Sequence, residues 1–425
     1  MTAHRVCIVG SGAREHALAL ALGRSADVLV TPGNPGIRGK TAEGFTLTSE
    51  DRPAPLVEAD LYVIGPEAPL VDGMADDLRA SGCLVFGPGR DGARLEGSKM
   101  AMKQLCSEAG IPTARWAAFD ELWPAVRFLR ALPGPYVVKT DGLAAGKGVL
   151  VTPDVEEAIS DVTAKLSGSS FGAAGERVVI EEAMSGPELS LFAVCDGRRS
   201  VPLAPAQDYK RVGDGDTGPN TGGMGACSPL PGVGEALVDD VMDRIVSPAL
   251  SFLHRSGVDY RGLLYAGLML TADGPRLVEF NVRFGDPETE VVLARMSGDL
   301  TRLLACAAEG DLRPAAGEAT FRDEAAVCVV AAAPGYPSAP VLGGPVSGVE
   351  RAGTLEGVTV FHAGTRLRDD GTLVTAGGRV LCVTALGRDL ASARERAYEA
   401  VGLVEFEGKV VRHDIAEAAA KGELG

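Results

Sequence analysis

The chain has 425 residues, of which 46% are hydrophobic and 23% charged, and its formal net charge at pH 7 is −16. This length exceeds what one hydrophobic core usually organises, so we expect a globular protein of about two to four domains. The acidic charge argues against nucleic acid or an anionic membrane as a partner, and no apolar run approaches the length of a membrane helix.

The first 97 residues alternate between two kinds of segment. Apolar segments that end in glycine or proline alternate with segments of helical spacing; the apolar ones are 5–10, 27–33, 61–66 and 83–88, and the helical ones 15–24 and 73–82. Such alternation is typical of a parallel sheet with helices between its strands. We therefore predict an α/β fold that begins with a doubly wound, Rossmann-like domain over residues 1–97.

Polar groups follow two of these strands. Gly10 and Gly12 form a G-x-G turn that leads into a helix, an arrangement that favours anion binding at the helix N-terminus. Glu15 stands where a dinucleotide fingerprint needs its third glycine, so that motif is weak. Glu67 follows a neighbouring strand, and the carboxyl ends of strands in open sheets form ligand crevices.

A glycine-rich loop lies between two predicted strands, in the segment KTDGLAAGKGV at 139–149. Three residues separate Gly142 from Gly146, and Gly148 replaces the hydroxyl of a Walker motif, so this is no P-loop. The flanking strands predict a hairpin whose backbone N–H groups and Lys147 approach an anion. A plain turn remains the alternative.

Lysine is scarce in this chain. Only nine of the 41 basic residues are lysines, and four of these lie in or beside glycine-rich motifs: Lys99, Lys139, Lys147 and Lys210. A compact ammonium group suits a phosphate oxygen, so we expect phosphate contacts, with chance clustering as the alternative.

The segments between 177 and 284 give four further predictions. Segment 177–190 is a strand that runs into an acidic connector, suited either to an adenine and its ribose or to no ligand at all. Segment 205–232 is expected to be a long functional loop without strands. A single long helix over 234–257 and a hairpin of 262–271 with 275–284 should follow.

The stretch VEFNVRFGDPETE at 278–290 is the most informative. In a strand, Val278, Phe280 and Val282 share one face, while Glu279, Asn281 and Arg283 share the other. Carboxylate and amide oxygens suit magnesium, and a guanidinium suits developing negative charge. A solvated strand face with a Glu–Arg pair is the alternative interpretation.

A last unit begins near residue 324, contains a hairpin within 365–386 and closes with two helices.

The eight cysteines show neither C-x-x-C nor zinc spacing, and the N-terminal segment lacks a signal-peptide pattern. These observations favour reduced thiols and a cytoplasmic protein. Of the five histidines, His16 follows the first turn, and we expect a structural role for it.

Together these motifs resemble ATP-grasp enzymes, and more narrowly the phosphoribosylamine–glycine ligase family. The resemblance spans nearly the whole chain and rests on GSGAREHAL, PGNPG, GPEAPLV, LEGSK, KTDGLAAGKGV, DGDTGPNTGGMGA, EFNVRFGDPET and FHAGT with GGRVL. It implies an N-terminal domain over 1–97, an ATP-grasp domain over 98–323 with a lid subdomain at about 118–188, and a C-terminal α+β domain over 324–425.

The resemblance also implies an activity. ATP would activate the carboxylate of glycine as glycyl phosphate, and the amine of 5-phosphoribosylamine would then displace phosphate, a step of purine biosynthesis. Mg²⁺ or Mn²⁺ would assist, and a closing lid would exclude water. A monomer is expected, with transient handover of the labile amine from the upstream amidotransferase.

Site residues are implied by position. Arg283 and Lys147 would be catalytic, and Glu279 and Asn281 would bind the metal. ATP would be bound by Lys99, Lys139, Gly142, Gly146, Lys147, Glu181, Glu182, Met184 and Glu188. The substrate would be bound by Gly10, Gly12, Glu15, Glu67, Arg283, Asp286, Gly378 and Arg379.

The chain departs from the family pattern at Tyr209, Cys227 and Glu290, usually His, Tyr and Gln, and its strand 262–271 offers no second metal carboxylate. Three alternatives stay open: an ATP-grasp ligase for another amine, a nucleotide sensor without turnover, and a Rossmann dehydrogenase suggested only by the first turn.

Overall fold

The computed structural model describes residues 4–142, 148–168 and 176–424. Its N-terminal unit is a six-stranded sheet of order β3-β4-β2-β1-β5-β6, parallel except for the edge strand β3. The predicted doubly wound sheet is therefore confirmed. Its strands are β1 (Arg5–Gly10), β2 (Asp27–Pro32), β3 (Gly39–Lys40), β4 (Thr46–Ser49), β5 (Leu61–Ile64) and β6 (Val85–Phe86). Its helices are α1 (Ala13–Leu22), α2 (Glu67–Val71), α3 (Met74–Ala80) and α4 (Arg90–Gly97), with a 3₁₀ turn at Ala54–Leu56.

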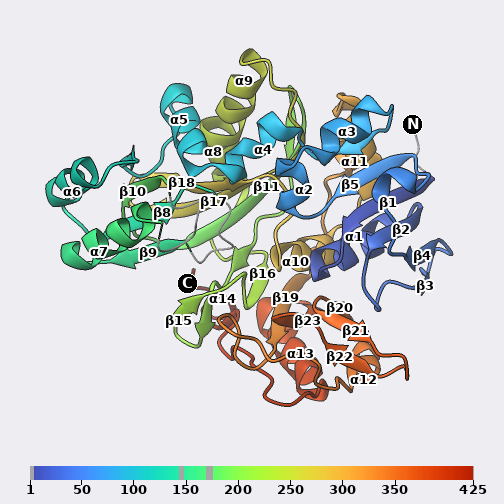
Figure 1. The fold of residues 1–425 in the computed structure, drawn as a ribbon. Helices are drawn as coiled ribbons and strands as arrows, with labels where there is room; N and C mark the ends of the chain where they lie inside the picture. The colour runs from blue at the N-terminus through green and yellow to red at the C-terminus, as the bar shows by residue number, and fades with distance from the viewer. Residues whose placement is uncertain (1–3, 143–147, 169–175, 425) are drawn as a thin grey trace.

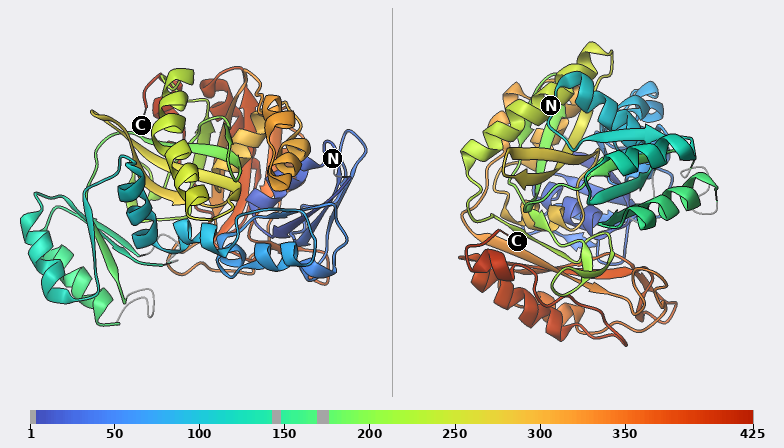
Figure 2. Two further views of the ribbon diagram at one scale, coloured as in Figure 1. Left: turned by 90° about the horizontal axis from the view of Figure 1, so that it is seen from above. Right: turned by 90° about the vertical axis from the view of Figure 1, so that its left-hand side faces the viewer.

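A small unit projects from the body of the molecule, at the left of Figure 1 and again in Figure 2. Its antiparallel sheet has the order β7-β10-β8-β9, and it has a hydrophobic core of its own that includes Leu129, Val138 and Ile180. Strands β8 and β9 pair in register from Lys139 with Val149, which confirms strands on both sides of the glycine-rich loop. The elements are β7 (Trp116–Phe119), α6 (Leu122–Ala131), β8 (Tyr136–Thr140), β9 (Val149–Thr152), α7 (Val155–Leu166) and β10 (Val178–Glu182).

The central sheet has the order β12-β11-β17-β18 and contains the predicted hairpin β17–β18. Its strands are β11 (Glu188–Asp196), β12 (Ser200–Pro202), β17 (Arg261–Thr271) and β18 (Gly274–Asn281). The helices of this part are α5 (Lys99–Ala109), α8 (Glu235–Val241), α9 (Ser247–Arg255), α10 (Glu288–Arg295) and α11 (Leu300–Glu309), with a 3₁₀ turn at Arg313–Glu318.

The single helix expected over 234–257 is interrupted. A π-helical stretch at Met242–Val246 separates α8 from α9. Pro248 lies in the first turn of α9 and has no N–H to donate to the preceding turn, so the hydrogen-bond register changes there.

The expectation of a strandless segment over 205–232 is wrong. Four short strands lie in it, namely β13 (Gln207–Asp208), β14 (Arg211–Gly213), β15 (Thr217–Asn220) and β16 (Gly225–Ser228). They are too short to show a period of two, and they form because partners elsewhere satisfy their backbone groups. Strand β16 is wholly buried and pairs with β19 (Ala325–Ala332) of the C-terminal unit.

The C-terminal unit, orange to red in Figure 1, is therefore completed by strands from the preceding segment. Its sheet has the order β13-β16-β19-β23-β20. Helix α13 packs on β19 and β23 through Ala393, Ala397 and Ala400, whose spacing places small side chains on one face. The remaining elements are α12 (Val349–Gly353), β20 (Val358–His362), β21 (Thr365–Leu367), β22 (Leu373–Thr375), β23 (Arg379–Gly387), α13 (Leu390–Leu403) and α14 (Glu417–Ala420).

All eight cysteines are free thiols, as the sequence predicted, and all except Cys83 are buried. None of the helices in the described ranges combines the length and apolarity that a membrane span requires.

The N- and C-terminal units are joined at His16 of α1. Its Nδ1 accepts a hydrogen bond from the backbone N–H of His362 at 3.0 Å. The amide of Asn34 donates to the carbonyl oxygens of Gly12 and His362 at 3.3 and 2.8 Å. Burial, together with the charge of His362, lowers the pKa of His16 to about 3. The structural role expected for His16 is therefore confirmed.

This contact predicts acid sensitivity. A histidine that stays neutral in the fold but is protonated in the unfolded chain loses stability as pH falls below about 6.5. The free energy of unfolding of the parent should fall between about pH 7 and about pH 5. In His16→Gln this fall should be smaller by about 2 kcal/mol. Urea titrations at both pH values measure this, with the exposed His254→Gln as the matched control. An unchanged pH dependence in His16→Gln would contradict the assignment.

Candidate active site

Strand β18 presents Glu279 and Asn281 of the predicted row of polar side chains, whereas Arg283 lies two residues beyond its end. Glu279 pairs with Gly267 and Asn281 with Tyr265, while Phe280 and Val282 are buried on the other face. A register shift between Gly267 and Leu268 interrupts the ladder just before this point. Because of that bulge, Leu277 is buried and Val278 only half-buried, so the predicted alternation is correct from Glu279 onward and wrong at Val278.

The Glu279 carboxylate lies in a strongly cationic environment. Burial raises its pKa, but Lys210, Lys99, Lys139 and Arg283 more than offset this and hold the pKa below its ordinary value. Glu279 is therefore charged at neutral pH. Within the described residues, neither its carboxylate nor the Asn281 amide oxygen accepts a hydrogen bond. Two oxygen ligands of the kind a hard divalent cation prefers are thus available side by side.

Lys139 is fixed by a buried ion-pair network. Glu181 on β10 places one carboxylate oxygen 2.7 Å from the Lys139 ammonium and the other 2.7 Å from that of Lys103 on α5. All three side chains are at most 7% exposed. Burial raises the pKa of Glu181, but Lys139 and Lys103 hold it below its usual value. The Glu181 side chain is therefore engaged in positioning two lysines.

Lys99, at the start of α5, points toward the glycine-rich loop. Its ammonium group donates to the carbonyl oxygen of Gly142 at 3.5 Å. Ser98 caps the helix and also donates to Asp141 at 2.9 Å, while the N–H of Met100 donates to the same Asp141 oxygen. The first turn of α5 is thereby tied to the end of β8. The other predicted loop residues, Gly146 and Lys147, lie outside the described residues.

The acidic connector between β10 and β11 contains Met184 and is flanked by Glu182, the last residue of β10, and Glu188, the first residue of β11. The Glu182 carboxylate accepts from the backbone N–H of Arg115 at 3.0 Å and contacts Arg276 at 3.4 Å. Met184 is half-buried. Glu188 accepts a hydrogen bond from Lys210, so this lysine is oriented beside Glu279.

Arg283 joins the central sheet to the N-terminal unit. Its guanidinium lies 3.3 Å from Glu67 at the start of α2 and 3.0 Å from Glu96 on α4. Glu96 also accepts from the backbone N–H of Val282 at 2.8 Å. Burial lowers the pKa of Arg283, but Glu96 and Glu67 more than compensate and raise it. A charged arginine is thus held at the end of β18.

The turn at Gly10 to Gly12 is built around the Glu15 side chain, which the sequence did not indicate. Glu15 accepts from the backbone N–H of Gly12 and from Arg14, whose Nε lies 2.7 Å away. A Cβ added to Gly10 would lie 2.6 Å from Glu15, and one on Gly65 only 2.1 Å. The Glu15 side chain therefore fills the space between the ends of β1 and β5 and fixes the turn.

Gly378 and Arg379 reach the site from the C-terminal unit. Arg379 donates to the carbonyl oxygen of Asp286 at 2.8 Å and to that of Gly222, and it lies 3.3 Å from the Asp286 carboxylate. A Cβ added to Gly378 would lie 2.5 Å from the ring of Tyr336. A Cβ added to Gly12 would lie 3.6 Å from the Asp286 carboxylate. The first turn, Asp286 and Arg379 are thus brought together from all three units.

Sequence reasoning missed Lys103 and Glu96. Lys103 is another of the nine scarce lysines and follows Lys99 by one helical turn, which was an available signal. Glu96 had no local signal, because its partner Arg283 lies on a distant strand.

The network around Glu181 predicts a large stability effect. Glu181→Gln removes the only charge that contacts Lys103 and Lys139 among the described residues and should cost about 3–5 kcal/mol in the free energy of unfolding. Glu417→Gln is the control, since it breaks an exposed pair with Lys421 and should change stability by less than about 1 kcal/mol. Chemical denaturation measures the free energy of unfolding of both variants. Equal losses would show that the buried network stabilises the fold no more than an exposed ion pair does.

Comparison with known proteins gives matches along most of the chain. Family models described as phosphoribosylglycinamide synthetase N domain, ATP-grasp (A) domain and C domain match residues 4–96, 97–289 and 326–418. A phosphoribosylamine–glycine ligase of Streptomyces coelicolor is 48% identical over 429 residues, 98% of this chain and 99% of the relative. One of Brucella melitensis is 45% identical over 427 residues, 99% of each chain.

Solved structures agree with this result. The crystal structure of phosphoribosylamine–glycine ligase from Thermotoga maritima has a TM-score of 0.85 at 36% identity, covering 97% of this chain and 100% of that one. A biotin carboxylase of Campylobacter jejuni has a TM-score of 0.70 at 13% identity, covering 96% and 93%, and thus shares the fold. The chain belongs to the phosphoribosylglycinamide synthetase family.

Proposed function

We propose that this chain is an ATP-dependent ligase that joins glycine to 5-phosphoribosylamine and releases glycinamide ribonucleotide, ADP and phosphate. The observation that carries the proposal is the end of β18. There the polar side chains Glu279, Asn281 and Arg283 lie near three lysines, Lys99, Lys139 and Lys210. The chain also matches the family over nearly its full length.

The reaction must bring two anions together, because the carboxylate of glycine attacks the γ-phosphate of ATP to form glycyl phosphate. Glu279 and Asn281 offer the oxygen ligands for Mg²⁺ or Mn²⁺, which neutralises phosphate charge when bound. Lys99 and Lys139 lie near Glu279 and would contact the phosphates. Arg283, held by Glu67 and Glu96, would stabilise the reacting carboxyl-phosphate group.

The other predicted site residues would bind the nucleoside of ATP and the phosphoribosylamine. The connector between β10 and β11 would hold adenine through the backbone groups of Glu182 and Met184. The Glu188 side chain would bind the ribose hydroxyls. The turn at Gly10 to Gly12, with Glu67, Asp286, Gly378 and Arg379, would bind the phosphoribosylamine. Lys147 keeps its proposed role at the phosphates as a prediction from sequence alone. We also infer a cytoplasmic monomer that receives the labile amine directly from the enzyme that makes it.

Product analysis tests the proposal. Purified protein is incubated with ATP, Mg²⁺, glycine and phosphoribosylamine, and each component is omitted in turn. Formation of glycinamide ribonucleotide with ADP supports the proposal. ADP release that does not need glycine, or that needs another amine, would favour a different ATP-grasp ligase, and ATP binding without turnover would favour a nucleotide sensor. Binding of NAD(H) without metal-dependent ATP binding would favour a dehydrogenase.

The metal role predicts a specific loss. Glu279→Gln should lower kcat by roughly 10²-fold or more and raise the Mg²⁺ concentration needed for half-maximal turnover, because one charged ligand is lost. Steady-state rates over a Mg²⁺ series measure this, and thermal unfolding checks that the fold persists. Asp273→Asn, in the exposed turn of the same hairpin, is the matched control. Near-normal turnover of Glu279→Gln at ordinary Mg²⁺ would disprove the metal role.

A further inference from the structure

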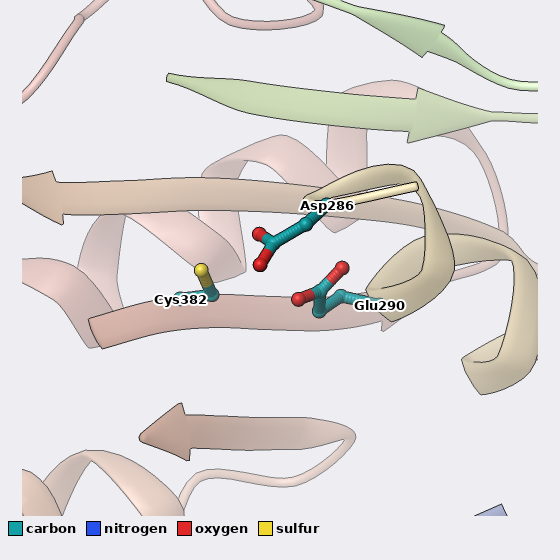
Figure 3. Close-up of side chains that lie close together, drawn as sticks. All are labelled: Asp286, Glu290 and Cys382. Carbon is teal, nitrogen blue, oxygen red and sulfur yellow. The ribbon is translucent and has the colours of Figure 1, made fainter. Parts of the chain in front are cut away.

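A buried carboxyl group without a hydrogen-bond partner lies beside the proposed substrate residues. Glu290 on α10 is 0% exposed, and neither of its carboxylate oxygens accepts a hydrogen bond. It points with Asp286 and Cys382 into a common space, as Figure 3 shows. One ligand atom from each of the three side chains lies within 4.8 Å of the others. One oxygen of Asp286, Oδ1, is also buried without a hydrogen bond.

The charges that face this space do not allow two ionised carboxylates. Asp286 and Cys382 face Glu290 together with the cation Arg379. Arg379 lies 3.3 Å from Asp286 Oδ1 and compensates that carboxylate. Among the described residues no cation hydrogen-bonds Glu290. A second negative charge in this buried space would therefore lack such a partner, and neighbouring carboxyl groups avoid this by retaining a proton.

The shifts in pKa agree with the geometry. Burial, followed by Asp286 and Cys382, raises the pKa of Glu290 well above its ordinary value. The hydrogen bond with Cys328, followed by burial, raises the pKa of the Cys382 thiol. A neutral thiol is a poor metal ligand, so a shared proton explains this group of side chains better than a metal ion does.

We propose that Glu290 is held as a neutral carboxylic acid whose O–H is directed at the Asp286 carboxylate, so that it positions the Asp286–Arg379 pair. Asp286 holds Arg379 through both its backbone carbonyl and its side chain, and Arg379 in turn binds the Gly222 carbonyl. Ionised Glu290 would repel Asp286 and loosen this connection. The effect on phosphoribosylamine binding rests on the proposed function, whereas the protonation state does not.

The first test uses stability and needs no turnover. A carboxyl group that is neutral in the fold but ionised when unfolded makes the native state lose stability as pH rises above about 4.3. Glu290→Gln keeps the size and a donor but removes the titration. The Tm of Glu290→Gln minus that of the parent should therefore increase between about pH 5 and about pH 8. Glu395→Gln, exposed on α13, should show no such trend.

Two further measurements complete the design. At neutral pH the infrared spectrum should contain the C=O band of a protonated carboxyl that is absent in Glu290→Gln. The KM for phosphoribosylamine should rise several-fold more than kcat changes in Glu290→Leu, and Glu290→Gln should restore it toward the parent value.

Three results would overturn the proposal. The first is a parent spectrum without the protonated-carboxyl band, and the second is a Tm difference that does not change with pH. The third is stoichiometric bound metal whose removal by a chelator lowers the Tm of the parent but not that of Glu290→Gln. Inactivity of the parent in the ligase assay would refute the proposed function and leave the stability and infrared results interpretable.

Discussion

Most of the cations near the end of β18 are held by carboxylates from elsewhere in the chain. Glu181 holds Lys139 and Lys103, Glu188 holds Lys210, and Glu67 with Glu96 holds Arg283. A protein with a net charge of −16 needs such concentration of positive charge to bind anionic substrates. Buried cations without partners would be costly, so the buried pairs of Lys139, Lys103 and Arg283 serve folding as well as the site. The position of these side chains therefore depends on correct packing of distant segments.

Ion pairs also connect the three units. Arg283 is bound by two acidic side chains of the N-terminal unit, and Arg379 reaches from the C-terminal unit to Asp286. His16 and Asn34 join the outer two units directly. A site assembled in this way from side chains of all three units requires their correct relative placement, and the interfaces supply it through buried polar contacts rather than through apolar packing alone.

The sequence predicted the elements whose patterns are local. Four strands of the first sheet (β1, β2, β5 and β6), the hairpin β17–β18 and the polar side chains from Glu279 follow from apolar patterns and turn residues, whereas β3 and β4 were not predicted. Three of the scarce lysines, Lys99, Lys139 and Lys210, do lie near Glu279, and their contacts with phosphate remain a prediction. The failures have non-local causes: β16 is a strand because β19 pairs with it, and Val278 turns from the core because of a bulge. Glu96 could not be found without knowing which helix lies against Arg283.

The pairing of β16 with β19 has a consequence for synthesis on the ribosome. Strand β16 ends at Ser228, and β19 begins at Ala325, so nearly a hundred residues must be translated before β16 obtains its partner. Until then a wholly buried strand exposes one edge and its apolar side chains to other nascent chains. Chaperone demand, and the loss of soluble product on premature termination, should therefore concentrate in this interval of translation.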